Sequence, residues 1–245
     1  MNIRFKTQFT GQEGQVGTQK EAVLRTQAYQ AQYSQRQAAF FFSAAAITLL
    51  LEQSEAAGIR FYYGESTPGQ QALIAVATSK TGKDLSAGAI IRDTTTAAGR
   101  QPLATLTSSP AVNRAVVESI TLTQAADWTA QHRATLPGTM HGAFFGRELL
   151  LATLQRDNAA GLGLYSCLTE RGELSLLFIP LADEQSQVTC GFWEWLVTTM
   201  NPMICPNQCD PNGLFGFSLA HLSLGAAQNL RVQRAQQRAA CLLAK

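Results

Sequence analysis

The sequence FFSAAAITLLLEQSEAAGIRFYYGESTPGQQALIAVATS, residues 41–79, recurs without a gap as FFGRELLLATLQRDNAAGLGLYSCLTERGELSLLFIPLA, residues 144–182. Gly58 of the first copy corresponds to Gly161 of the second, an offset of 103 residues (161 − 58). The same offset pairs other residues along the stretch: Phe41 with Phe144, Leu51 with Leu154, Tyr62 with Tyr165, Gly69 with Gly172 and Leu73 with Leu176. A duplicated sequence predicts a duplicated structural module.

The front half of each copy predicts a core helix. Apolar residues recur there at helical spacing: Phe40, Ala44, Ile47 and Leu51 in copy one, and Phe145, Leu149 and Ala152 in copy two. Alanine and leucine also have high helix propensity. We expect these helices to end at Gly58 and Gly161, because glycine adopts the left-handed C′ conformation at little cost.

The back half of each copy predicts a β-hairpin. Aromatic and β-branched residues favour strands, and Pro and Gly favour turns. The expected strands are Ile59–Tyr63 and Ala72–Ala77 in copy one, and Leu162–Ser166 and Leu174–Ile179 in copy two. The predicted fold class is therefore α+β, with two pseudo-symmetric tandem modules, each of helices plus an antiparallel hairpin or sheet, and a C-terminal helical tail.

Four segments are expected along the chain: a first module at 1–92, a linker at 93–113, a second module at 114–213 with a Cys-Pro loop, and a helical tail at 214–245. The linker is rich in Thr, Ser, Gly and Pro. The Cys-Pro loop is the run NPMICPNQCDPNG, which its Pro, Asn and Gly content predicts to be without regular structure.

The first module begins with a polar arm that predicts an extended or edge-strand conformation. A Gln-rich helix is expected from Thr18 to about Gln37, with Thr18 and Glu21 forming a capping box. Its polarity is typical of a solvated surface helix, and contact with another subunit is the alternative. At the offset of 103, Thr121 starts a second such helix.

Composition excludes some classes of partner. The 245 residues carry a net charge of +2, and the basic residues are scattered apart from the tail, so we expect no nucleic-acid partner. Apolar content is 46%, enough for a packed core, yet apolar runs are too short to span a membrane. The start of the chain lacks the apolar core of a signal peptide, and the cysteines are five, an odd number. A cytoplasmic protein with reduced thiols is therefore expected.

One group of residues predicts a metal site. Cys205 and Cys209 share a loop, Cys190 precedes them and His221 follows, and thiolates with imidazole are zinc ligands. Because a second tight cysteine pair is missing, a free pair or a weak disulfide is the alternative. The run Lys80–Asp84 does not predict a phosphate loop, since Asp follows the Lys where Ser or Thr is required. No activated nucleophile or carboxylate pair is recognisable, and we expect His132 to be exposed on its helix and His141 to form local contacts.

Other residues predict surfaces for partners. The aromatic candidates are Tyr62, Tyr63, Tyr165, Trp193 and Trp195. They would serve an interface or be covered by a flanking helix, and the sequence favours neither. Arg231, Arg234 and Arg238 form a basic stripe on the tail helix, which is either solvated or docked on a partner.

The order core helix, IRFYYG strand, turn and LIAVAT strand, with ITLTQAADWTAQHR and a Cys-Pro loop around copy two, resembles a set of uncharacterised bacterial proteins, mostly from Bacteroidetes-type genomes. Those typically carry one copy with a "GIRIYYG" strand. The resemblance covers residues 121–209 and, less fully, 18–79. It supports the module boundaries and implies no activity.

Two hypotheses about function follow. The first is a non-enzymatic structural or interaction protein that self-assembles into a homo-oligomer or filament through its modules and through residues 1–37 or 214–245. It is motivated by a duplicated fold in which no catalytic set is recognisable. The alternative is a zinc-dependent or small-molecule enzyme, with its site at Cys190, Cys205, Cys209 and His221 or at the module junction.

Overall fold

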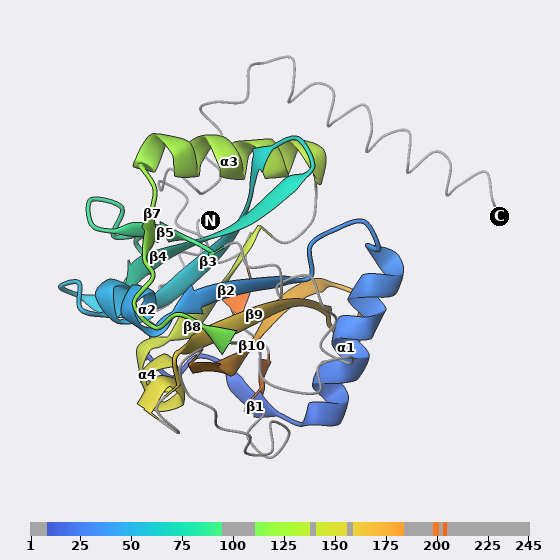
Figure 1. Ribbon diagram of the computed structural model, residues 1–245, viewed down its shortest axis with the longest axis horizontal. Coiled ribbons are helices and arrows are strands. Elements are labelled where there is room, and N and C mark those ends of the chain that lie inside the picture. Colours follow the sequence, from blue (N-terminus) through green and yellow to red (C-terminus); the bar gives the residue numbers. More distant parts are fainter. Residues whose placement is uncertain are drawn as a thin grey trace, which may run out of the picture.

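The structure, a computed structural model, describes residues 9–94, 111–137, 141–155, 159–183, 198–200 and 203–204. These residues form an α+β fold, as predicted, with four helices and two main sheets (Figure 1). The helices are α1 (Gln19–Gln32), α2 (Ala44–Leu51), α3 (Leu122–Thr135) and α4 (Arg147–Gln155). Among the described residues, no helix has the length and apolar character needed to cross a membrane.

One sheet has six strands, all paired antiparallel. Its order is β12 (Met203–Ile204), β8 (Gly142–Gly146), β3 (Ala56–Thr67), β4 (Gln70–Ser79), β5 (Ile90–Arg92) and β7 (Glu118–Ser119). The other has four strands in the order β2 (Ala39–Ser43), β9 (Gly161–Leu168), β10 (Leu174–Asp183) and β6 (Ala111–Val112), of which only the last pair is parallel. A separate pair joins β1 (Gln15–Gly17) to β11 (Thr198–Met200).

The two sheets pack face to face, because aromatic rings from each meet in one core. The Phe42 ring of β2 lies 5.3 Å from that of Phe61 of β3, edge to face. The Phe145 ring of β8 lies 5.0 Å from that of Phe178 of β10 in the same way. Edge-to-face contacts of this kind add to the free energy of burial.

Helices cover the outer faces of both sheets. On β3, Ile59, Phe61 and Tyr63 face the central core, whereas Tyr62 packs with Ala125 of α3. Figure 1 shows α3 and α1 on separate sides of the molecule, with the strands between them. On the four-stranded sheet, Ala22 of α1 packs in the same cluster as outward-facing residues of β9 and β10. The molecule is therefore layered as helix, sheet, sheet, helix, and α2 and α4 contact each other and contribute to the central core.

The predicted core helices begin later than expected, since their phenylalanine-rich starts are strands. Residues 39–43 form β2 and residues 142–146 form β8, and helices follow each directly. Ser43 caps α2 by accepting a hydrogen bond from the Ala46 N–H at 3.1 Å. Consecutive aromatic residues favour a strand buried on both faces, and every residue of β2 and β8 is buried.

These two strands pair across the halves of the chain. β2, from the first half, adds to the sheet of β9 and β10, and β8, from the second half, adds to the sheet of β3 and β4. Ser43 pairs with Gly161 in one ladder, and Gly146 pairs with Gly58 in the other. Each sheet thus contains strands from both halves.

The predicted role of Gly58 and Gly161 as left-handed helix ends is wrong. Gly58 lies inside β3 and Gly161 starts β9, and neither has a positive φ. A Cβ at Gly58 would lie 2.2 Å from the Phe145 carbonyl oxygen, and one at Gly161 would lie 2.2 Å from that of Phe42. The close approach of the neighbouring strands β8 and β2 therefore requires glycine at these positions.

Other expected local features are confirmed. Thr18 and Glu21 form the capping box of α1, and Thr121 and Gln124 form that of α3. The four hairpin strands lie within β3, β4, β9 and β10, and the turn glycines Gly69 and Gly172 have φ values of 82° and 74°. α1 ends at Gln32, five residues before the expected end, and Tyr33 caps it by donating its N–H to the Tyr29 carbonyl oxygen.

The predicted linker and Cys-Pro loop are only partly described. At the borders of the linker, Asp93 and Thr94 are buried and residues 111–112 form β6. Part of the loop is regular, contrary to expectation, because Met203–Ile204 pair with β8 as β12. The division into segments stays a prediction, and the tail at 214–245 lies outside the described residues.

Candidate functional site

A polar cluster lies between the two sheets. The Tyr63 hydroxyl of β3 and the Ser166 Oγ of β9 are 2.9 Å apart and share a hydrogen bond, although both residues are buried. Burial raises the pKa of Tyr63 well above its usual value, so it remains a neutral phenol. Tyr29 of α1 completes this side of the cluster, and burial raises its pKa too. This polar contact connects the sheets inside an otherwise apolar core.

Two histidines from the second half border this cluster. The His132 ring of α3 stacks on Tyr63, with centroids 5.4 Å apart and planes at 20°. The His141 ring lies 6.4 Å from that of His132, edge to face. The expectation that His132 is exposed is wrong, because only 1% of it is accessible. The packing of α3 places the His132 ring against Tyr63, and an imidazole has enough apolar ring surface to be buried there.

Both imidazoles are neutral at pH 7. Burial lowers the pKa of His132 to about 3, with further lowering by His141 and the nearby arginines. Burial also lowers the pKa of His141 to about 4, and Arg133 adds to this. Neither nitrogen of His132 has a hydrogen-bond partner among the described residues. Ser166 is therefore not bonded to the His132 base and lacks the activation that a nucleophile needs from that ring.

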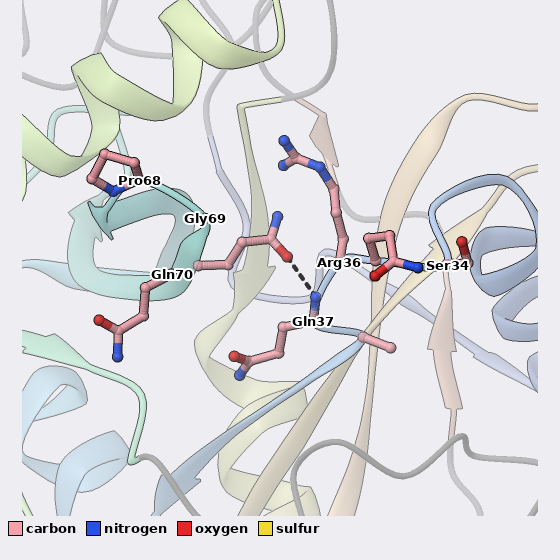
Figure 2. A pocket seen from close by; sticks show the side chains of 9 residues that line it. Ser34, Arg36, Gln37, Pro68, Gly69 and Gln70 are labelled. Carbon is pink, nitrogen blue, oxygen red and sulfur yellow. Dashed lines mark hydrogen bonds between the residues drawn. The ribbon is translucent and has the colours of Figure 1, made fainter.

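A pocket of about 600 Å³ opens between residues 34–38, which join α1 to β2, and residues 68–71, which comprise the turn after β3 and the start of β4. Its lining is predominantly polar. Figure 2 shows the Arg36 side chain rising from the first segment, with Pro68 and Gly69 to one side and Ser34 to the other. The Gln37 N–H donates to the Gln71 Oε1 at 2.7 Å, which joins the two segments.

A second polar cluster lies on the other face of β3. Arg60 and Asp84 form a buried ion pair, and the Tyr62 hydroxyl donates to the Asp84 Oδ2 at 2.5 Å. Arg60 Nη2 also donates to the Gly82 carbonyl oxygen at 3.2 Å. Burial raises the pKa of Tyr62 well above its usual value, and the Asp84 charge adds to this. These groups bond to one another and to the Gly82 carbonyl oxygen, so the cluster attaches the loop after β4 to β3.

Of the aromatic residues considered for an interface, three are buried inside the chain. Tyr62, Tyr63 and Tyr165 are 0%, 2% and 1% accessible. α3 covers Tyr62, Tyr63 faces the central core, and α1 covers Tyr165. In this chain these three side chains therefore do not form an exposed surface for a partner, since helices cover Tyr62 and Tyr165 and the central core encloses Tyr63.

The remaining predicted site residues lie outside the described part of the chain: Trp193, Trp195, Cys190, Cys205, Cys209, His221, Arg231, Arg234 and Arg238. Within the part that is described, no three His, Cys, Asp or Glu side chains gather as metal ligands. The zinc site stays a prediction, because its residues are not among those searched.

Sequence reasoning did not bring Tyr63, Ser166, Tyr29 and His132 together, although a signal exists. Tyr63 and Ser166 are 103 residues apart, and so are Tyr29 and His132. Each pair therefore occupies matching positions of the duplicated sequence. Arg36 carried no such signal. Comparisons with protein-family models, curated proteins and solved structures gave no match.

Proposed function

We propose that this chain is a non-enzymatic structural or interaction protein that self-associates, and that its two halves are copies of one module interlocked by strand exchange. The observation that carries the proposal is the pairing of β2 with β9 and of β8 with β3. A module that gives one strand to the sheet of another copy of itself is built as strand-exchanged dimers are. Here both copies lie in one chain.

The ladder registers support this interpretation. β2 pairs Ala39 with Tyr165, and β8 pairs Gly142 with Tyr62. The offset of 103 residues relates the two pairs, because Ala39 corresponds to Gly142 (39 + 103) and Tyr165 corresponds to Tyr62 (165 − 103). The bounds of α1 and α3 differ by the same 103 residues. The contact between Tyr63 and Ser166 joins matching positions, as expected at an approximate two-fold axis.

The buried ionisable groups also favour a structural role. Arg60, Asp84 and Tyr62 are bonded to one another, and Tyr63 is bonded to Ser166. These groups therefore hold elements of the fold together. A catalytic role would instead need an ionisable group that reaches a substrate.

Self-association through residues 1–37 or 214–245 is the second part of the proposal. The inner face of α1 is already used within the chain, since Ala22, Thr26 and Tyr29 are buried. The outer face of the same helix carries Leu24, which remains 56% exposed, so the outer face is open to a neighbour. A contact between unlike surfaces of two copies would close into a ring or continue as a filament.

Light scattering on the purified full-length protein, with electron microscopy, tests self-association. We expect a mass above that of one chain, and a smaller mass after deletion of residues 226–245 with the circular dichroism spectrum unchanged apart from the loss of helix. A full-length protein that stays monomeric at high concentration would exclude self-association.

Co-expression of two fragments, 1–104 and 105–245, tests the interlocked modules separately. We expect them to co-purify as a folded complex, because each sheet needs a strand from both. Fragments that fold independently and do not associate would exclude the exchange. Metal analysis, with Cys209→Ser as the variant, tests the zinc-enzyme alternative, which stoichiometric bound zinc lost in the variant would favour.

A further inference from the structure

The pocket between residues 34–38 and 68–71 is lined by a cation, Arg36, that has no counter-charge among the described residues. Arg36 forms no ion pair with any described residue, and its Nη1 is buried without an acceptor in that part of the chain. Burying a charged group without a partner costs free energy unless another group supplies the opposite charge. The Arg36 guanidinium is therefore suited to an anion from outside these residues.

In the part of the chain that the structure describes, neighbouring titratable groups do not form an ion pair with Arg36. The Arg36 charge acts on both Tyr29 and His132, so these rings lie near it. Tyr29 is a neutral phenol and His132 a neutral imidazole at pH 7, because burial disfavours their charged forms. The two lining segments, 34–38 and 68–71, contain no Asp or Glu. Glu65 lies close to the turn, but its Oε1 accepts from the Gly69 N–H and its Oε2 from the Thr135 hydroxyl.

The rest of the lining supplies neutral hydrogen-bonding groups held in place. Gln71 accepts from the Gln37 N–H, and the Gln37 Nε2 donates to the Ala39 carbonyl oxygen at 2.8 Å. Gln70 accepts from the Thr67 hydroxyl at 3.1 Å. Carboxamides both donate and accept, so they match a ligand that carries an amide or hydroxyl group. A volume of about 600 Å³ is within the range of small-molecule sites.

We propose that this pocket binds a small carboxylate that also carries an amide or hydroxyl group, with Arg36 as its anchor. The planar guanidinium matches a carboxylate by two parallel hydrogen bonds, which is the geometry that arginine favours. The polar lining disfavours an apolar or aromatic ligand. The proposal does not rest on self-association, although residues 34–37 belong to the segment 1–37 proposed to contact a neighbour; its test measures ligand binding and not oligomeric state.

The arginine Nε–H signals in ¹H–¹⁵N spectra of the full-length protein test the proposal directly. The probe is N-acetylglycine, which has one carboxylate and one amide, and the matched neutral probe is N-acetylglycinamide. Arg36→Gln assigns the Arg36 signal by its loss. We expect N-acetylglycine to shift that signal saturably, and the neutral probe to bind at least about tenfold more weakly, as loss of a charged hydrogen bond implies.

Two variants complete the test. Arg36→Gln should weaken binding of N-acetylglycine by about tenfold or more, measured by calorimetry. Arg171→Gln is the matched control, since it removes the same charge from an exposed turn outside the pocket lining and should bind normally. No saturable shift of the Arg36 signal, or equal binding of both probes, would overturn the proposal. Inorganic phosphate binding in place of the carboxylate would overturn it as well. If Arg36→Gln does not fold, the comparison of the two probes on the wild type decides.

Discussion

Replacing Gly58 by alanine perturbs the pairing of β3 with β8 at a single atom. The added Cβ would lie 2.2 Å from the Phe145 carbonyl oxygen and 2.6 Å from Cζ of the Phe144 ring. The shortest ordinary distance between a carbon and a carbonyl oxygen is about 3.3 Å, so β8 must move away by about 1 Å. The ring can rotate, but the carbonyl belongs to the backbone of a paired strand.

The expected cost follows from this geometry. Overpacking a closely packed site typically costs about 1–3 kcal/mol, and a contact with backbone lies at the upper end. We therefore expect Gly58→Ala to lower the free energy of unfolding by about 3 kcal/mol. Gly161→Ala should behave alike, because its Cβ would lie equally close to the Phe42 carbonyl oxygen.

Gly69→Ala is the matched control. Gly69 has a φ of 82°, and a Cβ there would have nothing within 4 Å, so only the backbone conformation opposes alanine. That strain costs roughly 1 kcal/mol. Urea unfolding followed by tryptophan fluorescence measures all three variants. If Gly58→Ala costs no more than Gly69→Ala, the close approach of β8 to β3 is not what requires glycine at position 58.

Two further outcomes are expected. Tyr63→Phe and Ser166→Ala should each lower the free energy of unfolding by about 1–3 kcal/mol, because each leaves the other buried hydroxyl without its partner. The double variant should lose less than the sum of the two single losses, and strict additivity in urea unfolding would show that the two residues do not interact. Burial raises the pKa of Asp93 to about 6, so the folded state holds this proton more tightly than the unfolded state, and the free energy of unfolding should fall by about 2 kcal/mol as pH rises from 4 to 6. Asp93→Asn should remove this dependence while still accepting from the Leu73 N–H, and a difference between variant and wild type that stays constant over that range would contradict the assignment.

Local features of this protein were predictable from the sequence, because short-range interactions determine them. The capping boxes at Thr18 and Thr121 depend on residues three apart, and the turns at Gly69 and Gly172 need only a residue that tolerates positive φ. The content of aromatic and β-branched residues, together with the turn residues between the strands, was sufficient to place the four hairpin strands. The offset of 103 residues indicated how these features would recur.

Longer-range features were decided only in three dimensions. Phe40 to Phe42 suit a helix or a strand equally by apolar pattern, and pairing with β9 makes them a strand. The local sequence around Gly58 is typical of a helix end. Glycine is needed there for another reason, since a Cβ would clash with the Phe145 carbonyl oxygen of the neighbouring strand. His132, Tyr63 and Arg36 are distant in sequence, and only the packing of α3 against β3 places the first two together. A single sequence records which residues each position tolerates locally. Strand pairing and side-chain burial depend on partners far along the chain, such as Ala39 and Tyr165, which are 126 residues apart (165 − 39), and their proximity is a property of the folded chain.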